Sequence, residues 1–133
     1  MLKIKLLPVI LFLSLIVMGC QNNSQELQNK NLDLNDEVTS IEVYEWNGEE
    51  LITTIDDKEL IEGLINELDN AKTHSTAHID WALPDYELHF KHNNEVIYEI
   101  GYCKDIQRFG DGAVGRYWEF DQLYEVNTKL PVE

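Results

Sequence analysis

The most suggestive chemical motif in the chain is a glycine-rich hexapeptide at residues 110–115, which reads GDGAVG. Its spacing matches G-x-G-x-x-G, a loop that holds a pyrophosphate between a strand and the N-terminus of a helix. Here the third glycine precedes the strand-like run RYWEF, and Asp111 would place a negative charge beside the phosphates. We therefore expect a glycine-rich connection between two antiparallel strands, with no nucleotide and no cofactor.

A second group of reactive side chains lies in the segment HSTAHID, which contains His74, His78 and Asp80. Two histidines at this spacing align their imidazoles only on a helix, whereas this segment is rich in Ser and Thr and follows an expected helix end. Zinc sites need three or four well-placed ligands. Exposed loop histidines are the simpler interpretation, and metal capture by His74, His78 and Asp80 is the alternative.

Hydrolytic chemistry has weaker support. Ser75, His78 and Asp80 include the residue types of a catalytic triad, but no strained strand-to-helix turn surrounds the serine. Paired carboxylates such as Glu49-Glu50 fall in turn and cap sequences, whereas general acid–base work needs carboxylates across a cleft. We expect no catalytic residue and a chain that is not an enzyme.

Aromatic residues are numerous for a chain of this size. Most of them, including Tyr86 and Tyr117, are expected in the core or packed on a sheet. If Trp81 and Trp118 were exposed together, they would form a contact surface for a peptide, a glycan or a protein.

The first twenty residues have the pattern of an export signal. Lys3 and Lys5 precede an apolar run over residues 6–18, and Gly19 and Cys20 follow. This run is shorter than the roughly 20 apolar residues of a membrane-spanning helix, and a basic start with a short apolar stretch is typical of a secretory signal. An ordinary secretory signal and an uncleaved anchor are the alternatives to the lipoprotein signal described next.

The tetrapeptide VMGC at residues 17–20 resembles the lipobox of bacterial lipoproteins, with Val17 where that motif usually has Leu. The resemblance implies that the Cys20 thiol receives a diacylglycerol and that the signal peptide, residues 1–19, is removed. Two acyl chains give stable anchoring where one does not. The expected location is therefore the extracytoplasmic face of the cell membrane, with the bilayer as a partner through Cys20.

The charge of the chain limits its other partners. Ten basic residues stand against 25 acidic ones, for a formal net charge of −15. Such a chain cannot neutralise phosphates, so nucleic acid is not expected as a partner. A solubilising surface is the simplest interpretation, and a cationic partner or bound cations are the alternatives. Cys103 has no disulfide partner if Cys20 is lipidated, and we expect it to be a small buried residue.

Beyond the signal, residues 20–38 are polar and predict a lipidated, disordered tether, and residues 39–133 predict a single domain. Strands over 40–46 and 49–55 flank Asn47-Gly48, a strong hairpin signal. An amphipathic helix follows over 56–72, with Asp56 and Glu59 as a capping-box-like start.

Two alternating strands follow, over 85–92 and 95–103. A three-residue loop, 92–94, would keep both apolar stripes on one face and pair Phe90 with Val96 and Leu88 with Tyr98, with Asn94 in a left-handed conformation. Further strands are predicted over 105–109 and 116–120, and a short final helix over 121–130. This β-β-α-β-β-β-α order predicts an α+β, two-layer domain with a mostly antiparallel sheet and helices on one face.

The C-terminal half also resembles the YhfM-like domain of small lipoproteins and membrane-anchored proteins of Bacillus-type bacteria. The resemblance covers residues 40–130 and depends on Pro84-Asp85-Tyr86, Phe90, Asp111-Gly112 and Tyr117-Trp118. It implies an envelope location and a small domain, and it supplies no catalytic residue. We expect a membrane-anchored extracytoplasmic lipoprotein with a non-catalytic binding domain for an unknown protein or envelope partner. The alternative is a cation- or solute-capturing lipoprotein that uses acidic and histidine residues.

Overall fold

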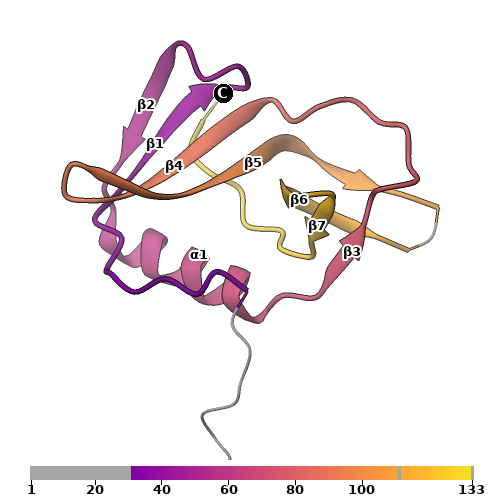
Figure 1. Ribbon diagram of the computed structural model, residues 1–133, viewed down its shortest axis with the longest axis horizontal. Coiled ribbons are helices and arrows are strands. Elements are labelled where there is room, and N and C mark those ends of the chain that lie inside the picture. The colour runs from indigo at the N-terminus through magenta and orange to yellow at the C-terminus, as the bar shows by residue number, and fades with distance from the viewer. Residues whose placement is uncertain (1–30, 111, 133) are drawn as a thin grey trace, which may run out of the picture.

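The computed structural model describes residues 31–110 and 112–132, which form a seven-stranded sheet with one helix across one face (Figure 1). The elements are β1 (Ser40–Glu45), β2 (Leu51–Ile55), α1 (Lys58–Asn70), β3 (Thr73–Ser75), β4 (Tyr86–His92), β5 (Glu95–Arg108), β6 (Val114–Glu119) and β7 (Gln122–Tyr124). The strand order is β2-β1-β4-β5-β6-β7-β3, and all neighbours are antiparallel. A mostly antiparallel α+β architecture is confirmed for these residues. The predicted signal peptide and Cys20 lie outside them.

The first hairpin forms where Asn47-Gly48 predicts it. Gly48 has a φ of 78°, which a residue with a side chain rarely adopts, and its N–H donates to the Glu45 carbonyl at 2.7 Å. Both strands are shorter than expected. A bulge after Val43 shifts the register of the pair, so that Tyr44 lies opposite Leu51.

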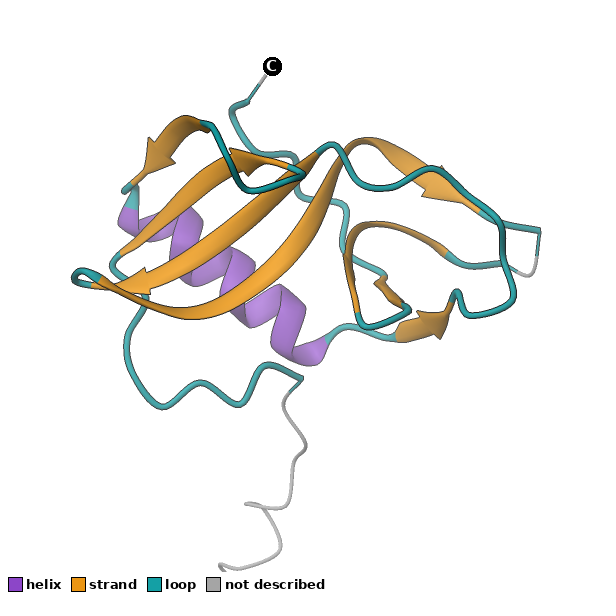
Figure 2. Cartoon of the chain, turned by 45° about the horizontal axis from the view of Figure 1, so that its top comes forward, coloured by secondary structure: helices purple, strands orange, loops and turns teal. Residues whose placement is uncertain are grey.

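The N-cap of α1 lies one residue later than predicted. Asp57, not Asp56, is the N-cap, and its carboxylate accepts hydrogen bonds from the N–H groups of Glu59 and Leu60 at 3.1 and 3.3 Å. A capping oxygen must reach the second or third amide of the helix, which only Asp57 does here. The predicted apolar face is buried in the core through Ile61, Leu64 and Leu68. Figure 2 shows α1 lying across one face of the sheet.

The loop between β4 and β5 differs from the prediction. Asn93 and Asn94 alone form the turn, and Asn93, not Asn94, has the left-handed conformation, with a φ of 56°. A bulge after Phe90 places that residue opposite Tyr98, so the predicted pairing of Phe90 with Val96 is wrong, and Leu88 pairs with Ile100. The apolar residues of β4 and β5 still lie on one face of the sheet. A two-residue loop alone would place them on opposite faces, and the extra residue in the bulge returns them to the same face.

The predicted helix over 121–130 is also wrong, and the described chain has one helix. Phe120 and Asp121 have φ values of 52° and 61° and form a two-residue turn from β6 into β7. The next residues continue without helix as far as residue 132. Leu123, Val126 and Leu130 are buried at a spacing that resembles a helical face. A short strand and an extended tail bury them instead.

This tail supports the buried tyrosines of the helix-covered face. The Leu130 N–H donates to the Tyr102 hydroxyl at 2.8 Å, and the Tyr117 hydroxyl donates to the Thr128 carbonyl at 2.7 Å. Buried hydroxyl groups need such partners, since leaving one unpaired costs free energy. The tail therefore completes the layer that α1 begins.

The segment over 31–38 lies along α1, although the sequence assigns it to the tether. Leu32 and Val38 are buried. The Asn31 side-chain amide donates to the Leu68 carbonyl at 2.6 Å, and the Leu32 N–H donates to the Asp69 carboxylate at 3.0 Å. The packed domain thus includes residues from Asn31 onward.

The glycine-rich hexapeptide connects β5 to β6, which are antiparallel, as the sequence predicts. Gly112 has a φ of 96°. At Gly115 a Cβ atom would lie 2.0 Å from the Tyr124 carbonyl oxygen, so only glycine allows β7 to approach this closely. Asp111 lies outside the described residues.

Candidate functional site

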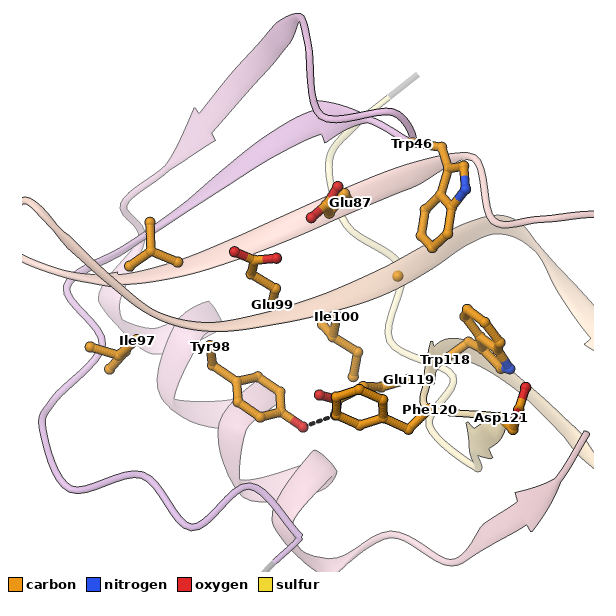
Figure 3. A pocket seen from close by; sticks show the side chains of 12 residues that line it. Trp46, Glu87, Ile97, Tyr98, Glu99, Ile100, Trp118, Glu119, Phe120 and Asp121 are labelled. Atoms are coloured by element: carbon orange, nitrogen blue, oxygen red, sulfur yellow. Dashed lines mark hydrogen bonds between the residues drawn. The ribbon is translucent and has the colours of Figure 1, made fainter.

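A groove of about 640 Å³ opens beside the first half of β5 (Figure 3). β6 pairs with β5 only from Gly101 onward, whereas residues 95–100 of β5 pair with β4 on their other side. The groove thus follows a strand edge that β6 does not cover. Because side chains alternate along a strand, the groove receives Glu99 from the helix-free face and Tyr98 from the opposite face.

Tryptophan rings form one wall of the groove and continue beyond it. Trp46 and Trp118 line the groove with ring centroids 6.0 Å apart, and Trp81 packs edge-on against Trp118 at 5.4 Å and against Phe109 at 5.6 Å. All three tryptophans are half-buried. The structure therefore brings Trp81 and Trp118 together, but half-buried rather than exposed as the predicted contact surface would require.

The floor beneath these rings is Gly101, which lies opposite Trp118 across β5 and β6. A Cβ atom at this position would lie 2.8 Å from Pro84 Cγ and 2.9 Å from Trp46 Cζ3. The Trp118 Nε1–H donates to Thr76 Oγ1 at 2.8 Å, and Thr76 is itself buried. Close packing over a glycine and one hydrogen bond hold the two tryptophan rings in place.

Phe120 stands at the rim of the groove in an unusual conformation. It occupies the two-residue turn with Asp121, and both have positive φ, as in a type I′ turn. Such turns favour Asn and Gly, because a left-handed backbone costs a residue with a side chain roughly 1–2 kcal/mol. Phe120 is 84% exposed, so packing within the domain does little to offset this strain.

The charges around the groove have a single sign. Four carboxylates line it, and none of the lining side chains is a lysine or an arginine. A site of this kind attracts cations, and aromatic faces add cation–π attraction. The four carboxylates belong to Glu87, Glu99, Glu119 and Asp121.

Glu119 is the most enclosed of the four carboxylates. Its carboxylate accepts hydrogen bonds from the hydroxyls of Tyr98 and, at 3.3 Å, Tyr124. Burial raises the pKa of Glu119, and the two hydroxyl groups lower it by a smaller amount. This carboxylate is fixed in position, with its charged form partly disfavoured.

A cluster suited to metal ligation lies beside the groove on β4 and β5. Within the part of the chain that the structure describes, Glu87, His89 and Glu99 are the only group that brings three such side chains together, with one ligand atom from each within 4.8 Å of the others. The His89 Nε2 and Glu87 Oε2 atoms are 3.2 Å apart. Burial and the hydrogen bond with Glu99 raise the pKa of Glu87, while His89 lowers it.

The histidines that the sequence offered as metal ligands lie elsewhere. His74 belongs to β3, a strand where a loop was expected, and its Nε2 lies 3.6 Å from Glu125 Oε2. His78 and Asp80 are exposed in the segment after β3. His78 and Asp80 do not converge with His74. His74 is held opposite Leu123 by the pairing of β3 with β7, and the chain turns at Thr76 before it reaches His78 and Asp80.

Ser75, the serine of the considered triad, and Cys103 also have defined environments. Ser75 Oγ accepts a hydrogen bond from the Ala77 N–H at 3.3 Å. Cys103 is buried, as predicted, and burial, with a smaller contribution from Asp85, raises the pKa of its thiol to about 12. A thiolate is the reactive form of cysteine, so Cys103 is unreactive at neutral pH.

Comparison of the chain with models of protein families, with curated proteins and with solved structures finds no match. The resemblance to the YhfM-like domain therefore depends on the sequence motifs alone. Across residues 31–110 and 112–132, the structure contains no helix that is long and apolar enough to span a bilayer.

Two parts of this site were missed in the sequence. The turn at Phe120 was hidden by an apparent helical pattern in the residues after it, and only the strand-turn-strand arrangement reveals the exposed ring. The cluster of Glu87, His89 and Glu99 did have a signal: the alternation of β4 places Glu87 and His89 on the face opposite to its apolar stripe. The partner on β5 depends on the register, which the bulge changes.

Proposed function

We propose that the protein is a lipid-anchored extracytoplasmic lipoprotein with a non-catalytic binding domain, and that its groove holds a basic, extended segment of a partner protein. The observation that carries this proposal is Phe120, which combines a strained backbone with an exposed aromatic ring at the rim of the groove. Strain that packing does not explain is a recognised feature of functional sites.

Burial of Phe120 by a partner would offset the cost of this conformation. The transfer of a large apolar side chain from water stabilises a complex by about 1.5–3 kcal/mol. Trp46 and Trp118 offer further aromatic surface beside it. Aromatic residues of this kind are enriched among those that dominate binding energies.

The class of partner follows from the charge of the groove and from its strand edge. Four carboxylates without a lining lysine or arginine favour a basic ligand. Residues 95–100 offer a backbone edge that β6 does not cover, and an extended peptide can add to such an edge through main-chain hydrogen bonds. Alternating basic and apolar side chains would meet the carboxylates and the rings respectively.

Anchoring at Cys20 is proposed from the lipobox-like tetrapeptide at residues 17–20. Mass spectrometry of the native protein tests it directly. We expect an N-terminal peptide that begins at Cys20 and carries a diacylglycerol, and a Cys20→Ala variant that leaves the membrane fraction or keeps its leader. An unmodified thiol on the native chain would refute the anchor and leave the groove proposal untouched.

The groove is tested with an octapeptide of alternating lysine and valine, labelled with a neutral fluorophore and followed by fluorescence anisotropy at physiological salt. We expect the Phe120→Ser variant to bind about tenfold more weakly, a loss of about 1.4 kcal/mol. Leu51→Ser is the matched control, because Leu51 is also an exposed apolar residue but lies on β2 at the far edge of the sheet.

A second peptide separates strand addition from simple charge attraction. N-methylation of alternate residues keeps the charges of the peptide and removes half of its backbone N–H donors. The methylated peptide should therefore bind the wild-type protein more weakly than the unmethylated one. Equal binding of both peptides, or equal losses in the Phe120→Ser and Leu51→Ser variants, would show non-specific attraction to an acidic protein and would contradict the proposal.

A further inference from the structure

The helix-free face of the central strands carries a row of ionisable side chains next to the groove. His89 on β4 lies opposite Glu42 of β1 and opposite Glu99 of β5. Glu87 precedes His89 by two residues and therefore shares its face. Three neighbouring strands thus place an imidazole among three carboxylates.

Two of these carboxylates have no lysine or arginine as a partner in the row. The Lys91 ammonium group is 3.2 Å from Glu42, whose other carboxylate oxygen accepts a hydrogen bond from the Tyr44 hydroxyl at 3.0 Å. Glu87 and Glu99 face His89 instead, with Glu87 Oε2 3.2 Å from the imidazole Nε2. Adjacent carboxylates repel one another, and a cation between them removes that repulsion.

The three side chains are held by regular structure. Glu87, His89 and Glu99 stand on two paired strands, and the Tyr44 ring packs on the imidazole with centroids 4.5 Å apart. Glu87 and His89 are partly buried, and Glu99 is exposed. A preorganised cluster with one open side can bind an ion without rearrangement of the backbone.

We propose that Glu87, His89 and Glu99 form a binding site for a divalent transition-metal ion such as Zn²⁺. One imidazole and two carboxylates are ligands that Zn²⁺ accepts, and three protein ligands leave a position for water or another group. Affinity for Mn²⁺ should be lower, in keeping with the Irving–Williams order. Ca²⁺ takes six to eight oxygen ligands and should bind weakly.

This site goes beyond the proposed binding of a basic segment, and it uses residues other than the loop histidines that the sequence suggested. Glu87 and Glu99 also line the groove, whereas His89 does not. Substitution of His89 therefore separates metal binding from the aromatic contacts of the groove.

The test is calorimetric titration of the full-length protein in detergent with zinc chloride, repeated with manganese and calcium chlorides. We expect one Zn²⁺ per chain in the wild type, and an affinity lowered by about tenfold or more in His89→Gln and in Glu99→Gln. Glu95→Gln, which removes another exposed carboxylate from β5, and the double variant His74→Gln/His78→Gln should bind as the wild type does.

Circular dichroism of each variant without metal checks the fold, and the exposed Glu99 gives a variant that should fold normally. No zinc binding at millimolar concentration would overturn the proposal. Binding that survives both His89→Gln and Glu99→Gln, or that disappears in the His74→Gln/His78→Gln variant, would also overturn it. Zinc binding by Phe120→Ser should be unchanged, so failure of this proposal is distinguishable from failure of the groove proposal.

Discussion

The two faces of the sheet differ in how completely the rest of the chain covers their apolar side chains and provides partners for their polar groups. On the helix-covered face, α1 and the C-terminal tail enclose the apolar stripe, and backbone groups of the tail pair with the Tyr102 and Tyr117 hydroxyls. On the helix-free face, tryptophan rings stay half-buried, and Glu87 and Glu99 have no lysine or arginine beside them among the groove-lining side chains. Folding requirements account for the first face, whereas the second keeps features that a partner would use.

The largest expected effect is a difference in stability between substitutions of two neighbouring residues of β4, Leu88 and Glu87, which point to opposite faces of the sheet. Leu88 is fully buried, and Leu88→Ala should lower the free energy of unfolding by about 2–5 kcal/mol. Glu87→Ala should change it by no more than about 1 kcal/mol. Urea denaturation of both variants measures the difference, and equal effects would show that the two faces are equally important for stability.

A smaller effect is expected at Gly101, beneath the tryptophan rings. Gly101→Ala forces the Trp46 ring or Pro84 to move and should cost about 1–3 kcal/mol. Gly63→Ala, on α1 with open space around it, should instead stabilise the protein by up to about 1 kcal/mol. Thermal unfolding gives the stabilities, and near-ultraviolet circular dichroism should change only for Gly101→Ala.

Phe120→Asn should raise stability while it weakens binding. Asparagine tolerates the left-handed conformation, so the free energy of unfolding should increase by about 1 kcal/mol. Chemical denaturation measures this gain, and anisotropy with the lysine–valine octapeptide measures the loss of affinity. A less stable Phe120→Asn variant would mean that the ring contributes to folding and would remove the main support for the groove proposal.

The smallest expected effect is the pH dependence at Glu119. Burial raises the pKa of its carboxyl group in the folded state, so its stabilising contribution is present below the unfolded pKa and is lost as pH rises through the folded pKa. Glu119→Gln should therefore be more stable than the wild type at pH 7, by less than about 1 kcal/mol. The two proteins should have the same stability near pH 3, as thermal melts across this range would show.

Local signals in the sequence identify much of the fold. Asn47-Gly48 marks the first hairpin, the apolar spacing marks α1, and the alternation of β4 shows which of its residues face the core. The wrong predictions arise where one local sequence pattern is compatible with two different structures. The buried residues Leu123, Val126 and Leu130 fit a helical face, yet a left-handed turn before them commits the chain to a strand and a tail.

The groove could not be predicted in the same way, because its residues come together through strand register. Trp46 and Trp118 are far apart in the chain and meet over Gly101, and Glu99 reaches His89 through a pairing that depends on one bulge. A shift of one residue would turn Glu99 to the opposite face. The residue types were visible in the sequence, and their convergence was not.

The packing of the tail also determines when this domain can fold during synthesis. Leu130 follows every strand that the structure describes. Its side chain is buried, and its N–H donates to the Tyr102 hydroxyl. A nascent polypeptide that still lacks this residue has an incomplete core and an unpaired phenolic group. Closure of the core therefore waits until the chain has been released as far as Leu130.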